Sequence, residues 1–145
     1  VWDIRDKTPV RSMYGPLICG DAIDIFEEVI LTASWTQTNQ LQMWELGTGK
    51  LITTVKWEDG YRPSADPTLL YSGQFSKNDG SLILAGGSNS YEARVFDRNN
   101  LDKNVCVIYD MSREIDAVDF SNKGDKFAIA GGDGYVRLFS MNIIA

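Results

Sequence analysis

The sequence contains no histidine among its 145 residues. Histidine is the side chain whose unperturbed pKa best suits proton transfer near neutral pH, and it commonly ligates transition metals. Sites of the Ser-His-Asp and Cys-His types therefore cannot be built from this sequence. The carboxylates lie beside glycine or in polar stretches that are typical of solvated loops, so we expect no catalytic residues and no enzyme activity here. They include Glu27, Glu28, Glu58, Asp59 and Asp133.

The sequence also lacks the motifs of metal and cofactor sites. The cysteines Cys19 and Cys106 match no CxxC spacing, so we expect each to be a small buried residue and not a ligand. Two unpaired thiols are typical of a reducing compartment, although a single bridge between them stays open. No loop of the DxDxDG type offers oxygen ligands for calcium. The sequence predicts no metal and no cofactor.

The charge pattern limits the classes of partner. The formal net charge is −6 and the isoelectric point is about 4.6, which opposes binding to nucleic acid. No adjacent arginine pair or basic run offers a surface for phosphoinositides, and no apolar stretch approaches the ~18 residues of a membrane span. We expect no nucleic-acid and no membrane partner. We expect a location inside the cell, cytoplasmic or nuclear, which includes cytoskeletal and ciliary structures.

An internal repeat runs through the chain. Four segments contain an aromatic residue followed by an acid or its equivalent, and these aromatic residues are separated by 42, 52 and 43 positions. A second mark fixes the register, because Ile25 and Phe120 end similar tetrapeptides and each stands 19 residues before the aromatic residue of its unit. The four segments are Val1–Ile4, Met43–Leu46, Val95–Arg98 and Leu138–Met141.

The residue pattern within each repeat unit predicts short β-strands. Runs rich in Val, Ile, Leu, Thr and aromatic residues alternate with Gly, Asn, Asp and Ser, and no long helical pattern competes. The sequence therefore predicts an all-β chain whose full units fold as four short antiparallel strands. The expected units are residues 20–57, 69–109 and 114–141, preceded by the remainder of a unit at residues 1–14.

These marks resemble those of the WD-repeat family. Trp2–Asp3 and Trp44–Glu45 match the family dipeptide, Phe96–Asp97 is close to it, and Phe139–Ser140 is degenerate. The resemblance implies a β-propeller fragment of four-stranded antiparallel blades, about three full blades and a partial one. Because Val1 would lie inside a blade, we expect the carboxyl-terminal half of a larger propeller, completed by missing blades or by a second copy.

The chain departs from the family pattern at the Gly-His dipeptide, whose nearest remnant is Gly20–Asp21. In the family, a His, a Ser or Thr, a turn Asp and the Trp form a buried hydrogen-bonded tetrad, which is not expected to assemble here. The aromatic residues of the four marks are expected to pack between neighbouring blades. Arg94 and Arg137, at equivalent third-strand positions, are expected on the blade surface.

The resemblance also implies a binding face. In the family, the turns between second and third strands and the segments between blades open on one face, where partners bind. An insertion with Tyr61 and Arg62 belongs to this face, and long turns bring Trp35 and Tyr91 to it. Arg113 is the remaining candidate, as a group for carboxylates or phosphopeptides. The alternative is that the aromatic residues cap their own blades and that the arginines are solvated.

The predicted function is that of a scaffold or adaptor, which binds partner proteins or peptides within a multiprotein complex. Two other functions stay open. One is a propeller that binds phosphoinositides or a membrane surface, which would need clustered basic residues on one rim. The other is a propeller enzyme whose site lies in the missing half.

Overall fold

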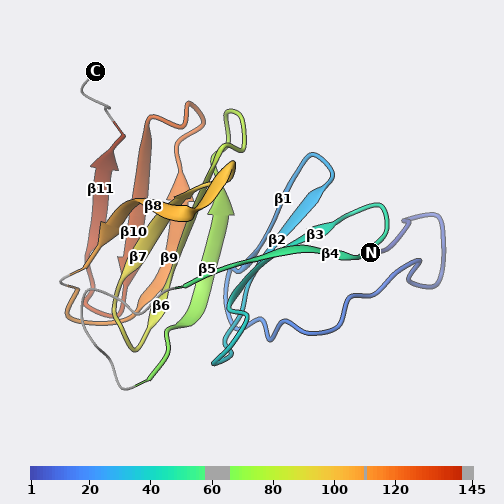
Figure 1. The fold of residues 1–145 in the computed structure, drawn as a ribbon, viewed down its shortest axis with the longest axis horizontal. Coiled ribbons are helices and arrows are strands. Elements are labelled where there is room, and N and C mark those ends of the chain that lie inside the picture. Colours follow the sequence, from blue (N-terminus) through green and yellow to red (C-terminus); the bar gives the residue numbers. More distant parts are fainter. Residues whose placement is uncertain (58–65, 110, 142–145) are drawn as a thin grey trace.

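The computed structural model of the chain describes residues 1–57, 66–109 and 111–141. These residues form eleven β-strands and no helix, so the expected all-β class is confirmed (Figure 1). Within the described residues there is accordingly no helix long and apolar enough to cross a membrane. The strands are β1 (Ile23–Phe26), β2 (Val29–Ala33), β3 (Leu41–Glu45), β4 (Leu51–Val55), β5 (Leu69–Phe75), β6 (Leu82–Ser88), β7 (Ala93–Asp97), β8 (Asn100–Ile108), β9 (Ile115–Phe120), β10 (Lys126–Gly131) and β11 (Val136–Ser140).

The strands form three antiparallel sheets, in which each strand pairs with the next one along the chain. The strand orders are β1-β2-β3-β4 in the first sheet, β5-β6-β7-β8 in the second and β9-β10-β11 in the third. Antiparallel neighbours need only short turns, which agrees with the Gly, Asn, Asp and Ser punctuation of the sequence. The first two sheets have four strands each, and the described part of the third has three.

The segment before β1 forms no strand. Trp2 and Pro9 make a single β-bridge, and the amide of Arg11 donates to the carbonyl oxygen of Val1. The side chain of the same residue reaches the first sheet. The Arg11 guanidinium donates to the carbonyl oxygen of Leu46, in the β3–β4 turn, at 2.6 Å. The partial unit expected at residues 1–14 is therefore represented by a single β-bridge and by no strand.

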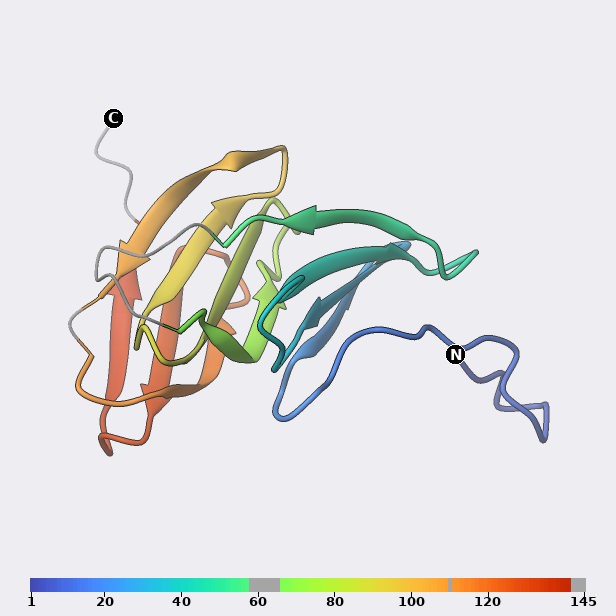
Figure 2. The same ribbon diagram turned by 60° about the horizontal axis from the view of Figure 1, so that its bottom comes forward.

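The three sheets stack in chain order, with the second sheet in the middle (Figures 1 and 2). One hydrophobic core lies between the first and second sheets and includes Leu31 and Phe75. The other lies between the second and third sheets and includes Leu84 and Ile115. Strand β5 contacts both β1 and β9, so the first strands of the three sheets lie side by side. Each sheet thus buries an apolar face against its neighbour.

Small residues allow the sheets to approach closely. A Cβ atom added to Gly73 on β5 would lie 2.9 Å from the Cβ of Ala33 on β2. A Cβ atom added to Gly86 on β6 would lie 2.8 Å from the Cγ2 of Ile115 on β9. Carbon atoms in contact prefer separations of about 3.5–4.0 Å, so both sheet interfaces depend on glycine at these positions.

The aromatic residues of the repeat marks have different environments. Trp44 and Phe96 are buried, and Phe139 packs partly buried against the second core. The indole Nε1 of Trp44 donates to Thr32 Oγ1 at 2.9 Å, so this pair bonds without a histidine. Trp2 is 64% exposed, and the expectation that it packs between sheets is wrong. Its one bridge, to Pro9, belongs to no sheet that could cover the indole.

Two arginines with equivalent positions in the sequence differ in burial. Arg94 is only 2% exposed, so its expected place on the surface is wrong. Trp57 covers its guanidinium, which pairs with the equally buried Glu92 at 2.6 Å, and this pair offsets the cost of burying the charge. The Arg137 side chain is 33% exposed and pairs with Asp133 at 2.7 Å. The Arg137 guanidinium lowers the pKa of the Asp133 carboxyl below its usual value.

The two cysteines also differ. Both thiols are free, so the disulfide that the sequence left open does not form. Cys106 is partly buried, and this burial raises the pKa of its thiol. Cys19 is exposed, and the expectation that it is buried is wrong, because it lies in the irregular segment that enters the first sheet.

Candidate functional site

One end of the three sheets gathers several turns and connections, which we call the loop face (lower end of Figure 1). Hydrogen bonds join its neighbouring parts. The amide of Leu70 donates to the carbonyl oxygen of Ser34 at 3.1 Å, and the Asn89 side chain donates to the carbonyl oxygen of Pro67 at 2.7 Å. These bonds join the first two sheets at the loop face. Its described residues are 34–40, 66–68, 89–92, 111–114 and 132–135.

Trp35 lies in the β2–β3 turn of the loop face and is 40% exposed. Its amide donates to the carbonyl oxygen of Leu17 at 2.8 Å, and the amide of Leu17 donates to Ser34 Oγ at 2.8 Å. These bonds fix the backbone of the turn against the segment that enters the first sheet. The indole is thus presented from a fixed backbone and keeps an open surface, as a recognition residue requires.

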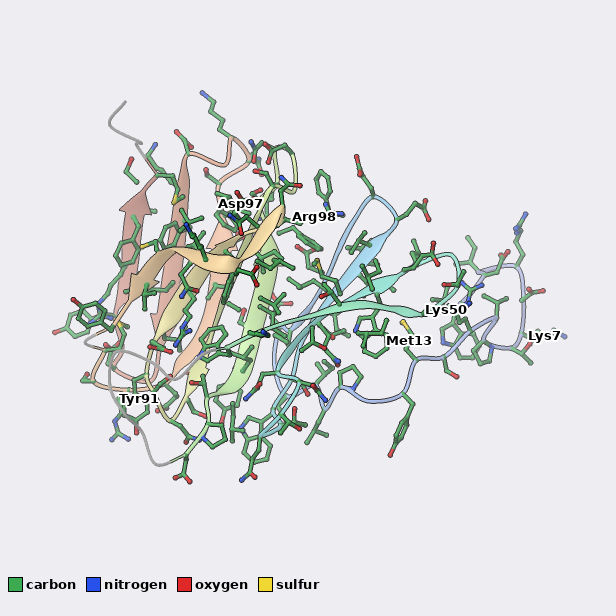
Figure 3. The ribbon with its side chains drawn as sticks, in the orientation of Figure 1. Lys7, Met13, Lys50, Tyr91, Asp97 and Arg98 are labelled. Carbon is green, nitrogen blue, oxygen red and sulfur yellow. The ribbon has the colours of Figure 1, made fainter. Side chains whose placement is uncertain are left out.

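Tyr91 lies in the β6–β7 turn. Figure 3 shows it at the lower end of the second sheet, away from Asp97 and Arg98 at the upper end. Its φ of 51° is a left-handed conformation that few residues other than glycine adopt. The ring packs against the second core, and the hydroxyls of Thr68 and Ser90, 2.5 Å apart, link the turn to the segment that enters β5. The half-buried Tyr91 is therefore held in one place.

For the other predicted site residues, no contact is described that fixes the side chain. Arg113 is exposed in the segment that enters β9, also on the loop face. Tyr61 and Arg62 lie outside the described residues. The structure thus places Trp35, Tyr91 and Arg113 on one end of the molecule, but on connections that belong to different sheets.

A depression of about 360 Å³ opens beside Tyr91, where the second and third sheets meet the segment that enters the first sheet, and we call it the Tyr91 depression. Two of its lining residues lie at β-bulges. The pairing of β5 with β6 leaves out Tyr71, and the pairing of β9 with β10 leaves out Asp116. Bulges redirect side chains, and here both redirected residues line the same depression. The lining includes Cys19, Tyr71, Asn89, Tyr91, Glu114 and Asp116.

The Tyr91 depression is acidic. Asp116 is exposed, but partial desolvation of its carboxyl raises its pKa, and the negative charge of Glu114 adds to the rise. In the part of the chain that the structure describes, no ion pair joins either carboxylate to a cation. Other carboxylates, such as those of Glu92 and Asp133, do have an arginine partner. No ion pair with a described residue therefore compensates the negative charge at the Tyr91 depression.

A second depression, of about 770 Å³, lies beside the first sheet and is lined by Trp57, Pro67 and the polar end of the β2–β3 turn. Two buried charged side chains hold the Trp57 indole in place. Its Nε1 donates to Glu92 Oε1 at 3.0 Å, and the Arg94 guanidinium lies 4.7 Å from its ring centroid. The Glu92–Arg94 pair thus anchors the start of the β4–β5 connection to the second sheet.

Neither the buried Glu92–Arg94 pair nor the bulged residues Tyr71 and Asp116 could be recognised from the sequence, and the reasons differ. Glu92 and Arg94 alternate with apolar residues, as solvent-facing residues of a strand do, and their burial follows from the covering by Trp57. The bulges that redirect Tyr71 and Asp116 depend on the pairing register of each sheet, which leaves no mark in the sequence.

The loop face offers several kinds of chemical group. Aromatic rings, carboxylates, amides and an arginine offer hydrogen bonds, charge and apolar contact. Nowhere in residues 1–57, 66–109 and 111–141 do three His, Cys, Asp or Glu side chains gather as a candidate metal site. No protein-family model and no curated protein matches the chain.

Proposed function

We propose that the chain is part of a WD-repeat β-propeller and acts as a scaffold that binds partner proteins or peptides through its loop face. The observation that carries this proposal is the meeting of turns from successive sheets at one end, with Trp35 and Arg113 exposed there. Loops on a rigid β-framework are common recognition sites, and Trp and Arg are enriched among residues that dominate binding energy.

Three features of the fold support its assignment to a propeller. The sheets are meanders that stack in chain order, and their first strands lie side by side. The Trp44–Thr32 hydrogen bond joins two of the residue types of the family tetrad, although the histidine is absent. On this proposal, residues 20–57, 69–109 and 114–141 are successive blades, each of which buries its core only against its neighbours.

The outer faces of the first and third sheets support completion of the propeller by further blades or by a second copy. Val136 and Leu138 on β11 are 77% and 71% exposed, and Ile23 and Ile25 on β1 are 52% and 54% exposed. Contiguous exposed apolar residues on a sheet are a typical contact surface between β-structures. We therefore place the contacts that complete the propeller on these two faces and reserve the loop face for other proteins.

Affinity purification of the tagged full-length protein from its native cells tests the proposed function. Trp35→Ala combined with Arg113→Ala is compared with Trp2→Ala combined with Lys123→Ala. The control pair removes the same kinds of side chain from exposed positions away from the loop face. We expect the loop-face variant to lose co-purifying proteins at least about tenfold, a change of ~1.4 kcal/mol, and the control to retain them.

Retention of every partner by the loop-face variant would contradict the assignment of these residues. The same comparison with Tyr61→Ala and Arg62→Ala added decides whether the insertion contributes to the site. Binding of the purified protein to phosphoinositide vesicles, in place of any protein partner, would favour the membrane-surface alternative instead.

A further inference from the structure

The Tyr91 depression combines three features that no other described part of the loop face has together. It is concave, with a volume of about 360 Å³, and it receives residues from the connections or strands of all three sheets. It has two tyrosine rings, from Tyr71 and Tyr91. It also has two carboxylates, from Glu114 and Asp116, that form no ion pair with a described cation. Each feature limits the class of ligand.

The positions of one tyrosine and one carboxylate of the depression are set by β-bulges. Ser72 on β5 and Ala117 on β9 each follow the residue that is left out of the pairing, so Tyr71 and Asp116 occupy the same position in two successive sheets. A regular ladder would direct neighbouring residues to alternate faces of the sheet, whereas a bulge redirects one side chain. The same irregularity therefore gives the depression one aromatic ring and one carboxylate.

The carboxylates favour a positively charged group. Glu114 is half-buried, and its carboxylate lies close to Gly132, where an added Cβ atom would collide with it. The raised pKa of Asp116 reflects partial desolvation first and the charge of Glu114 second, and a cation placed between the two carboxylates would offset both effects. Hydrogen bonds between charged partners are about twice as strong as neutral ones.

The tyrosines favour a cation on an apolar stem. Tyr91 is fixed by its packing against the second core, and Tyr71 is half-buried beside it in the lining. Aromatic rings attract cations through their faces, and they also pack against the methylene groups of lysine and arginine. A small inorganic cation has no methylene stem that could pack against the rings.

We infer that the Tyr91 depression binds an arginine or lysine side chain of a partner protein. The carboxylates of Glu114 and Asp116 accept hydrogen bonds from the charged head group, and the rings of Tyr71 and Tyr91 contact the stem. This inference rests on the proposed function, because it assigns a partner chemistry to the same loop face. The net charge of −6 for the chain agrees with a basic partner.

The test uses a blocked peptide, acetyl-Ala-Gly-Arg-Gly-Ala-amide, and the same peptide with citrulline in place of arginine. Citrulline keeps the shape of arginine but has no charge. Both peptides are titrated into the ¹⁵N-labelled full-length protein, with backbone amide shifts as the readout. We expect the arginine peptide to shift the amides of Tyr91, Glu114 and Asp116, and the citrulline peptide to bind at least about tenfold more weakly.

Matched variants separate the depression from general charge attraction. Glu114→Gln with Asp116→Asn removes two negative charges at the depression, and Glu27→Gln with Glu28→Gln removes two from the exposed β1–β2 turn at the opposite end. We expect the first variant to weaken binding of the arginine peptide about tenfold and the second to change it less than about twofold. Well-dispersed amide spectra show that each variant is folded.

Equal binding of the two peptides, or equal losses in the two variants, would overturn the inference. That result, with cellular partners still lost in the Trp35 and Arg113 variant, leaves the proposed function intact. Charge-dependent peptide binding at the depression, with all cellular partners retained by that variant, would support the inference and contradict the Trp35 and Arg113 assignment.

Discussion

At the scale of single residues, the buried pair of Glu92 and Arg94 has the largest expected effect on stability. Both side chains are almost fully buried, and Arg94 also lies over the ring of Trp57. Removal of one partner from a buried ion pair leaves an uncompensated charge in a medium of low polarity. We expect Arg94→Ala to lower the free energy of unfolding by ~3–5 kcal/mol in urea denaturation.

Arg5→Ala is the control for this prediction. Arg5 forms an ion pair with Asp3 at 2.5 Å, but its side chain is 85% exposed. Exposed pairs contribute little to stability, so we expect no measurable change. Equal destabilisation by the two substitutions would show that the burial of Arg94 has no particular energetic weight.

Asp116 gives a prediction about pH. The folded state raises the pKa of its carboxyl, through partial desolvation and the charge of Glu114, so the folded chain disfavours the ionised form. The stability contributed by Asp116 therefore falls as the pH rises from the unfolded pKa through the raised folded pKa, and it stays lower at neutral pH. We expect Asp116→Asn to be at least as stable as the wild type at pH 7.

Urea denaturation of both proteins between pH 7 and pH 4 checks this expectation. The difference in the free energy of unfolding should shrink as Asp116 becomes protonated in the wild type. A less stable Asn variant at pH 7, with no change as the pH falls, would mean that the ionised carboxylate stabilises the folded chain.

The residues that the sequence predicted correctly are those whose environment follows from periodicity. Trp44 and Phe96 are buried as their repeat positions indicate. Arg94 and Trp2 were predicted incorrectly, because their burial depends on what covers them from other segments. Trp57 covers Arg94, and one bridge to Pro9 leaves Trp2 exposed. Contacts between distant segments of the chain leave little trace in local sequence.

At the scale of elements, the contact between the first and second sheets depends on Gly73. An added Cβ atom would lie 2.9 Å from the Cβ of Ala33, so a larger side chain must push the two sheets apart. We expect Gly73→Val to lower the free energy of unfolding by about 1–3 kcal/mol. Thermal and urea denaturation provide the measurement.

Gly47→Val is the matched control, because an added Cβ atom at Gly47 would meet nothing within 4 Å. We expect its stability to lie within about 0.5 kcal/mol of the wild type. Similar losses at the two glycines would argue that the cost arises from the backbone or the unfolded state and not from the sheet interface.

The strand pattern was accessible from the sequence, and the bulges were not. Apolar runs between Gly, Asn, Asp and Ser predict β-strands, and the structure has antiparallel strands through each expected unit. The omission of Tyr71 and Asp116 from their ladders depends on how two strands pair, which a single sequence does not specify. The Tyr91 depression could therefore not be predicted, although the position of Tyr91 in a turn of this face could.

At the scale of the whole molecule, the stack of three sheets leaves apolar side chains on its outer faces. Because Val136 and Leu138 are 77% and 71% exposed, we expect the chain, when purified by itself, to self-associate with increasing concentration in light scattering. Leu138→Glu should reduce the mass, whereas Val105→Glu, at a 48% exposed position on β8, should not. A monomer at all concentrations would contradict the need for a partner at these faces.

Hydrogen–deuterium exchange of the purified complex shows where on the chain a partner protein binds. The chain is compared alone and bound to a protein that co-purifies with it from its native cells. We expect slower exchange in the complex at residues 34–40, 89–92 and 111–114, with no change in the opposite turns at 46–50, 76–81 and 121–125. Protection confined to those opposite turns, or to the outer faces of the sheets, would contradict the proposal that partners bind the loop face.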